Sequence, residues 1–357
     1  MRYWGISALS HDASLAVVED GRVVFAGHSD RYSRRKNDPF LHADLLDEAA
    51  AFGPPDRIAW YERPLLKKLR LVELTPPSFR LKRNVHRGIG AWLPGAAAPD
   101  LAASVQRVVE TVLLGAATWA GQQTGSRNLV LSGGLALNCV ANSLLAREAG
   151  FDHVWILPNP GDAGSSIGAV AAVSGETLAW PGPYLGTPLA GDYPVAELLR
   201  ALDTNGLVGV ANGRGEFGPR ALGNRSILAD PRPPGMKDKV NEIKGRERFR
   251  PFAPVVRAER AHELFDLPVT ASPYMQFTAQ CRSPADYPAI VHHDGTSRVQ
   301  TVERAQHPGL YALLEEWESR TGCPVLLNTS LNGRGEPLLN SADDVRRFTG
   351  HTGLPVY

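Results

Sequence analysis

Short apolar runs at the start of the chain predict three strands. Residues 3–7, 13–19 and 22–27 are rich in valine, alanine and isoleucine, and Asp20-Gly21 separates the last two runs. An Asp-Gly pair between apolar runs is a strong signal for a two-residue β-hairpin. The turn after the first run is polar and contains Ser10, His11 and Asp12. Such a turn can hold the phosphates of a nucleotide, or Asp12 can simply cap it.

Further along, strands, glycine turns and helices alternate. Helical spacing of apolar residues predicts an amphipathic helix over 100–123, with valines and leucines along one face. Strands at 128–131 and 153–157 each run into a glycine turn and then a helix. Helix N-termini beside such turns attract phosphate. The pattern predicts a nucleotide pocket built from the turns Ser10–Asp12, Ser132–Gly134 and Gly161–Ser165, with these cofactor-binding candidates: Ser132, Gly133, Gly134, Asn138, Gly161 and Gly164.

The remaining pattern indicates an α/β protein with two domains. The other predicted elements are helices at 41–52, 238–244, 310–321 and 343–350, and strands at 57–62, 207–211, 324–327 and the end of 292–302. Residues 63–99 read as a basic loop. A stretch rich in glycine and proline predicts a linker at 176–192, between a first domain at 1–175 and a second at 193–357.

Composition narrows the class of protein. The chain is 43% hydrophobic and 21% charged, which is ordinary for a soluble globular enzyme. A net charge of +1 argues against general binding to nucleic acid. Three isolated cysteines favour neither a disulfide framework nor a cysteine zinc site, and they fit a reducing cytoplasm. We find no signal peptide and no membrane span, and therefore expect a cytoplasmic protein without a membrane partner.

Positive charge is concentrated in residues 213–256, where ten cations stand against five acids. Glycines in the same stretch allow sharp turns and close approach to a ligand, and arginine grips phosphate or carboxylate in a bidentate way. A solvated basic face is the alternative, but it needs neither the glycines nor the prolines. We therefore predict an anion site, most simply for phosphate, from Arg220, Asn224, Arg225, Ser226, Lys244, Arg248 and Arg250. The polar turn after the strand at 324–327 adds Asn328, Ser330 and Asn332.

Several motifs in order resemble the NodU/CmcH/TobZ type of O-carbamoyltransferase. They include GISALSHDASLAVVEDG, NLVLSGGLALNCVAN, PNPGDAGSSIGA, PRALGNRSILADPR, VNEIKGRERFRPFAPVV and PVLLNTSLNGRGEP. The resemblance implies a shortened actin-like ATPase domain followed by a YrdC-like α/β domain. It implies that the second domain makes carbamoyl-adenylate from ATP and carbamoyl phosphate, with Mg²⁺ accompanying the nucleotide. The first domain would then pass the carbamoyl group to a hydroxyl of a small natural product.

Within this resemblance, Arg220 and Arg225 are expected to stabilise charge on phosphate and adenylate, as catalytic residues. His11 and Asp12 would lie at the acceptor end, with His11 as a base. The family also has an iron site with a His-x-x-x-His pair, which occurs nowhere in this sequence. Asp162 matches the family's aspartate ligand, but it can equally be a helix cap. We therefore expect no stoichiometric iron or zinc, unless a histidine such as His86 substitutes.

Three functions stay open at this point. The first is a complete carbamoyltransferase. The second is an adenylation-only half-enzyme that needs a partner chain, and the third is a non-catalytic nucleotide-binding protein. A homodimer also stays open, and no nucleic-acid partner is expected.

Overall fold

The computed structural model describes residues 1–9, 11–61 and 95–357. Its described residues form two compact units. One comprises 1–61, 131–139 and 156–357, and the other comprises 95–130 and 140–155. Ser10, His86 and most of the predicted basic loop lie outside the described residues. The elements are mixed α and β, as the sequence predicts.

The predicted N-terminal hairpin is confirmed and belongs to a four-stranded sheet. The sheet has the order β3-β2-β1-β4 and consists of β1 (Arg2–Ser7), β2 (Ser14–Glu19), β3 (Arg22–His28) and β4 (Arg57–Trp60). Strand β2 pairs antiparallel with both neighbours, whereas β1 pairs parallel with β4. Asp20 and Gly21 have φ angles of 48° and 76°, which are the two left-handed conformations that a type I′ turn requires.

Helices cover both faces of this sheet. Successive residues of β2 point to opposite faces, and both sets are therefore apolar. Leu15 and Val17 pack in one cluster with Leu45 of α2 (Ala43–Ala50). Ala16 and Val18 belong to another cluster, which includes residues of α7 (Ser165–Ser174). The approach of α7 is very close, because a Cβ on Gly5 would lie 1.9 Å from the carbonyl oxygen of Ser166.

A seven-stranded sheet forms the larger core. Its order is β12-β13-β14-β11-β15-β10-β8, from β8 (Leu207–Ala211), β10 (Arg225–Ala229), β11 (Ala253–Arg257), β12 (Phe265–Asp266), β13 (Phe277–Cys281), β14 (Thr296–Val302) and β15 (Val325–Ser330). Only β11 and β14 pair parallel. The sequence predicted β8, β14 and β15. It missed β10, β11, β12 and β13, because turn residues and cations interrupt the apolar pattern around them.

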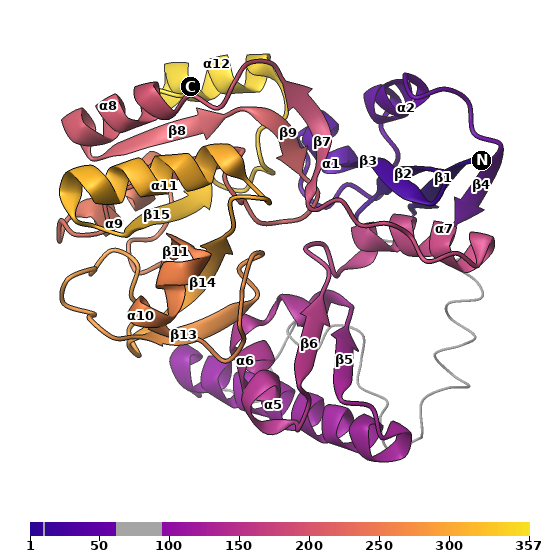
Figure 1. The fold of residues 1–357 in the computed structure, drawn as a ribbon, viewed down its shortest axis with the longest axis horizontal. Coiled ribbons are helices and arrows are strands. Elements are labelled where there is room, and N and C mark those ends of the chain that lie inside the picture. The colour runs from indigo at the N-terminus through magenta and orange to yellow at the C-terminus, as the bar shows by residue number, and fades with distance from the viewer. Residues whose placement is uncertain (10, 62–94) are drawn as a thin grey trace. The chain divides into compact units, whose positions relative to one another are not determined.

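Helices pack on this sheet and on each other. The helices in this part of the chain are α8 (Val195–Asn205), α9 (Met236–Ile243), α10 (Ala261–Leu264), α11 (Pro308–Thr321) and α12 (Ala342–Thr352). Helices α8 and α11 lie side by side (Figure 1), and leucines from both enter the core. Short helix α1 (Ser29–Ser33) follows β3 directly.

The stretch predicted as a linker, 176–192, is an ordered part of the first unit. It contains β7 (Tyr184–Leu189), which pairs antiparallel with β9 (Gly213–Glu216). Leu185 is buried, and Tyr184 donates a hydrogen bond to the carbonyl oxygen of Leu222. These contacts give the segment a fixed partner despite its glycines and prolines. The predicted domain boundaries themselves remain predictions.

The second unit is built on α5 (Ala98–Thr124), which is the predicted long helix. Gly125 ends it in a left-handed conformation with φ of 66°. The unit also takes in most of β5 (Asn128–Leu131), α6 (Cys139–Glu148) and β6 (His153–Ile156). Ala117 is the only fully buried α5 residue among those described, and most of the predicted apolar face, including Val105, Val109 and Val112, is half-buried. No helix in the described ranges is long and apolar enough to cross a membrane.

Buried His307 makes the fold sensitive to acid. Its Nδ1 accepts from the backbone N–H of Leu310, which caps α11, and its Nε2 lies 2.8 Å from Oδ1 of Asn224. Both nitrogens are therefore satisfied in the neutral ring. Burial lowers the pKa of His307 from 6.5 to about 4.

We expect stability to fall as the pH drops from about 6.5 toward 4, by up to about 3 kcal/mol from this residue. Over that range the unfolded chain binds a proton at His307 and the folded chain does not. Urea unfolding at pH 7 and pH 5 measures the loss. A His307→Asn variant keeps a capping oxygen without the titration. Equal pH slopes for the variant and the wild type would contradict this assignment.

Candidate functional site

A buried lysine holds the centre of the site. Lys244 follows α9 as its C-cap and is 3% exposed. Its ammonium lies 3.2 Å from Oγ of Ser330 and 2.7 Å from Oδ1 of Asn332, and it also donates to the backbone carbonyls of both residues. Burial lowers the pKa of Lys244 well below its ordinary value, while the four oxygens favour the ammonium form. The structure therefore joins three residues that the sequence predicted separately.

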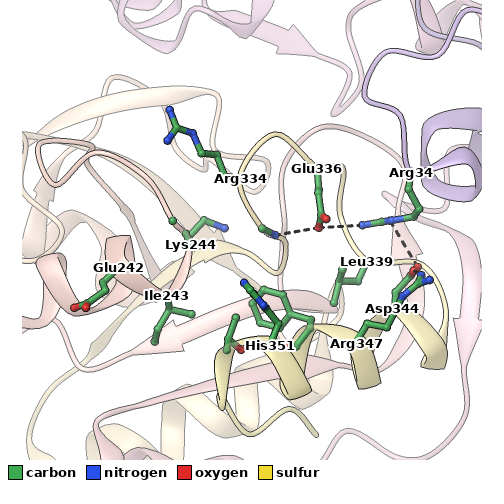
Figure 2. Close-up of a pocket in the computed structure, with 14 residues that line it drawn as sticks. Arg34, Glu242, Ile243, Lys244, Arg334, Glu336, Leu339, Asp344, Arg347 and His351 are labelled. Atoms are coloured by element: carbon green, nitrogen blue, oxygen red, sulfur yellow. Dashed lines mark hydrogen bonds and ion pairs between the residues drawn. The ribbon is translucent and has the colours of Figure 1, made fainter.

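Lys244 lies in the wall of a large cavity of about 950 Å³. The cavity is enclosed by the end of α9, the turn after β15 and helix α12 (Figure 2). Four cations line it, namely Arg34, Lys244, Arg334 and Arg347. Ligand pockets for molecules of drug or nucleotide size typically measure about 300–1,000 Å³. This volume therefore suits a nucleotide.

Arg34 fixes the far side of this cavity. It ends α1 in a left-handed conformation with φ of 58°. Its guanidinium donates to the carbonyl oxygens of Leu338, at 2.7 Å, and Pro337, at 3.1 Å. Figure 2 shows the same side chain between two carboxylates, Glu336 at 3.7 Å and Asp344 at 3.6 Å. The N-terminal segment thus contributes directly to the wall of the cavity.

A second, smaller cavity of about 90 Å³ is lined by three arginines. They are Arg220, Arg246 and Arg298, and none of the described residues around them in the lining is acidic. Ser330 also lines this cavity, so its contact with Lys244 shows that the two cavities are neighbours. Burial, and then the neighbouring Arg298, lowers the pKa of Arg220 to about 9. Uncompensated positive charge of this kind favours a small anion.

Several polar atoms around the small cavity have no protein partner. Nη2 of Arg246 and Nε of Arg298 are buried and donate no hydrogen bond to the described residues. Asn328 gives its amide N–H groups to Ala221 and Gln300, which leaves its buried Oδ1 without a donor. Buried polar groups are normally paired, so these atoms indicate a ligand with both acceptors and a donor. Arg246 and Arg298 were not predicted as site residues from the sequence, although Arg246 lies in the same basic stretch.

Arg225 has a different environment from the one predicted. It is 1% exposed, and its guanidinium donates to the carbonyl oxygens of Asn212, Gly213, Asn224 and Thr187, at 2.8–3.2 Å. Only its Nε, which is buried and donates to none of the described residues, is left for an anion. The structure therefore gives Arg225 the role of a brace for the loop before β10. A direct role in anion binding remains only a prediction from the sequence.

We expect Arg225→Met to lower the free energy of unfolding by about 3 kcal/mol or more, because four backbone carbonyls each lose a guanidinium donor. Urea unfolding of the variant measures this. Arg346→Met is a suitable control, because Arg346 is exposed and pairs only with Asp343 of its own helix turn. Equal stability of the two variants would show that Arg225 is not a structural brace.

The other predicted residues of this region either belong to the loop framework or are exposed outside the two cavities. Asn224 donates to the carbonyl oxygen of Arg214, and Ser226 accepts from the backbone N–H of Gly223, so both belong to the loop framework. Arg248 and Arg250 are exposed, and neither is among the residues that line the two cavities. Their predicted contact with phosphate has no support in this geometry and stays a prediction.

The glycine turns predicted for the first domain do approach one another. The N–H of Gly133 donates to the carbonyl oxygen of Pro160 at 2.7 Å, and Oγ of Ser132 lies 3.3 Å from the same oxygen. From the sheet, Ser7 and Ser14 donate to the carbonyl oxygens of Asp162 and Ala163. Gly164 is required here, because a Cβ would lie 2.0 Å from the carbonyl oxygen of Asn159.

Asn138 ends the short turn η2 (Gly134–Leu137), and Gly161 precedes η3 (Asp162–Gly164). Exposed His11 and partly buried Asp12 lie in the β1–β2 turn. The residues expected to form the nucleotide pocket are thus gathered at the ends of β1 and β2. A cavity enclosed by all three turns remains a prediction.

The residues do not fit the iron site implied by the resemblance. Among the described residues, the only group of three convergent metal-ligand side chains is Asp12, His28 and Asp30, and Asp162 is not part of it. His28 and Asp30 were not predicted as site residues from the sequence. Pairing of Ser14 with His28 in the hairpin could have indicated that His28 comes close to the β1–β2 turn. The absence of stoichiometric iron or zinc remains an expectation.

Comparison with known proteins identifies the family. The model for the carbamoyltransferase N-terminus matches residues 79–171, and that for the carbamoyltransferase C-terminus matches residues 199–357. The chain belongs to the carbamoyltransferase family. Both cavities described above are lined mainly by residues of the C-terminal match.

Relatives of this carbamoyltransferase-family chain are longer. It is 40% identical to protein sll1178 of Synechocystis over 70% of its own length and 49% of that protein. Nodulation protein NolO of Bradyrhizobium diazoefficiens is 38% identical over 69% of this chain and 50% of its own length. Nodulation protein U of Sinorhizobium fredii is 42% identical over 70% and 48%. The chain therefore spans about half the length of these relatives.

Proposed function

We propose that this chain is an ATP-dependent O-carbamoyltransferase whose described cavities carry the adenylation step. ATP would occupy the large cavity, with its phosphates directed at Lys244. Carbamoyl phosphate would occupy the arginine-lined cavity. The observation that carries this proposal is the contact of Lys244 with Ser330 at the junction of the two spaces.

The small cavity supports the choice of carbamoyl phosphate over a simple phosphate. Arg220, Arg246 and Arg298 offer donors to a phosphate group. The unpaired Oδ1 of Asn328 needs a donor, which the carbamoyl NH₂ group supplies, whereas inorganic phosphate offers one only through a protonated oxygen. A ligand with an anionic end and an amide end satisfies both parts of this cavity.

In the proposed reaction the carbamoyl group is released from its phosphate by water as carbamate, and a carbamate oxygen then attacks the α-phosphorus of ATP. Inorganic phosphate and pyrophosphate leave, and carbamoyl-adenylate forms. Lys244 and the three arginines stabilise the negative charge that develops on the phosphate oxygens. The carbamoyl group would pass to a hydroxyl of a small acceptor, with His11 as base and Asp12 beside it, and AMP would leave.

We assign the seven-stranded sheet and its helices to the YrdC-like fold, and the N-terminal sheet with its glycine turns to a shortened actin-like fold. These assignments rest on the sequence resemblance and on the order of elements. Mg²⁺ would accompany the nucleotide phosphates. An adenylation-only half-enzyme is the second candidate, and the missing His-x-x-x-His pair favours it.

The test is to incubate the purified chain with Mg²⁺, ATP and carbamoyl phosphate, and to measure pyrophosphate and carbamoyl-adenylate. We expect both products, and neither when carbamoyl phosphate is omitted. ATP binding without pyrophosphate release would identify a non-catalytic nucleotide-binding protein. Carbamoyl-adenylate that forms but is never transferred to any hydroxylated acceptor would support the half-enzyme.

A further inference from the structure

Three metal-ligand side chains converge at the edge of the N-terminal sheet. Asp12 comes from the β1–β2 turn, His28 ends β3, and Asp30 lies in the first turn of α1. One ligand atom from each lies within 4.8 Å of the other two. A cation that binds at about 2.0–2.2 Å holds its ligands at most about 4.4 Å apart. Three ligands of one cation cannot all lie that far apart, so the group has to contract to hold a cation.

Two carboxylate oxygens in this group have no hydrogen-bond donor among the described residues. They are Oδ1 of Asp12 and Oδ1 of Asp30, and both are buried. The side chain of Asp30 is only 8% exposed, and Nε of Arg31 lies 3.9 Å from its Oδ1, which is too far for a hydrogen bond. Burying a carboxylate oxygen without a partner is costly. A bound cation removes that cost.

We propose that Asp12, His28 and Asp30 bind a divalent cation of the Mn²⁺ class. Two carboxylates balance its charge, and a mixed oxygen and imidazole set suits such metals. Water would take the remaining positions. The site differs from the family's iron site, since it uses neither a His-x-x-x-His pair nor Asp162. It also stands independently of the proposed adenylation step, which takes place at other residues.

Both ring nitrogens of His28 have a polar neighbour. Its Nδ1 faces Asp12, with 3.4 Å to Oδ2, and its Nε2 lies 2.9 Å from the side-chain amide of Asn159. The ring packs against Phe217 at 4.9 Å between centroids. The atom of Asn159 that faces Nε2 is its amide nitrogen, so a cation on Nδ1, which leaves the proton on Nε2, requires this amide to turn and present its oxygen as acceptor. Such an outer partner fixes the ring of a ligating histidine.

The competing arrangement is a network of charges without metal. Protonated His28 and Arg31 would then balance Asp12 and Asp30. This network still leaves both Oδ1 atoms without a donor. The two arrangements differ in whether the metal-free protein takes up a cation at this place.

The experiment titrates Mn²⁺ into the full chain after removal of metals with a chelator, and follows bound Mn²⁺ by electron paramagnetic resonance. We expect one saturable Mn²⁺ per chain, a rise in melting temperature, and ¹⁴N coupling from the imidazole. Asp30→Asn and Asp12→Asn should each weaken binding at least about tenfold. His28→Gln should abolish the ¹⁴N coupling.

Asp44→Asn is the matched control. Asp44 also lies beside a histidine, 3.8 Å from Nδ1 of His42, but it is 71% exposed and belongs to no convergent group. Its Mn²⁺ affinity should equal that of the wild type. Near-UV circular dichroism checks folding, and the more exposed Asp12 keeps the test valid if Asp30→Asn does not fold.

Absence of saturable Mn²⁺ binding in the wild type would overturn the proposal, as would equal affinity in the folded Asp12→Asn variant. Pyrophosphate release without Mn²⁺ binding would overturn only this site and leave the proposed function intact. Mn²⁺ binding without pyrophosphate release would overturn the proposed function and leave this site intact.

Discussion

Replacing Lys244 with methionine should lower pyrophosphate release from ATP and carbamoyl phosphate by about a hundredfold or more. Loss of one preorganised donor in a catalytic site typically costs this much, because it acts where charge develops in the transition state. Lys244 is also the only lysine in the described lining of the large cavity. Initial rates at saturating substrates measure the effect.

Lys239→Met is the matched control, because this exposed lysine of the same helix donates only to the carbonyl oxygen of Asn205. Its rate should equal that of the wild type. Melting temperatures of both variants separate catalysis from folding, since Lys244 also holds Ser330 and Asn332 together. A folded Lys244→Met variant with a rate close to that of the wild type would remove Lys244 from the proposed mechanism.

Replacing Arg298 with glutamine should raise the KM for carbamoyl phosphate about ten- to a hundredfold. A hydrogen bond to a charged group contributes about 1.5–3 kcal/mol, and each 1.4 kcal/mol is a factor of ten. Arg298 lines the small cavity together with Arg220 and Arg246, burial lowers its pKa, and its Nε has no partner among the described residues, which together favour an anion there. The KM for ATP should change little, because Arg298 lines only the small cavity. Steady-state kinetics with each substrate varied in turn test this.

The charge pattern predicts that Arg248 binds phosphate, whereas its position in the structure predicts that it does not. The Arg248→Gln variant distinguishes these two predictions. Arg248 lies in the basic stretch but is exposed and lines neither cavity. We expect both KM values to remain unchanged in this variant. A large rise in KM for carbamoyl phosphate with Arg248→Gln, and none with Arg298→Gln, would reverse the two assignments.

Local patterns were sufficient for elements whose signals lie close together in sequence. The Asp20-Gly21 turn set the pairing of β2 with β3, and Gly125, Gly175 and Gly322 end α5, α7 and α11 in left-handed conformations. Strand β10 was missed because Arg225 and the glycine-rich loop before it read as a basic turn. Its burial between β8 and β15 depends on tertiary structure and has no local signal in the sequence.

The charge pattern located the candidate site but could not assign its side chains. Arg225 and Arg298 have the same chemistry, yet one donates to backbone carbonyls inside the protein and the other faces a cavity. Whether an arginine is paired inside the protein or faces a cavity depends on which acceptors folding brings within about 3 Å of its guanidinium. No local signal in the sequence reports those acceptors.

By its residues alone, this sequence determined the mixed α/β class, the N-terminal hairpin, the basic glycine-rich stretch and the family resemblance. These depend on side-chain periodicity, turn chemistry and contiguous motifs, which act over a few residues. Only the tertiary structure brought Lys244 to Ser330 and Asn332, which are 86 and 88 residues away, and Asp12 to His28 and Asp30. These contacts depend on the order of strands in the sheets and on the packing of α1. Both result from burial of residues that are far apart in the sequence.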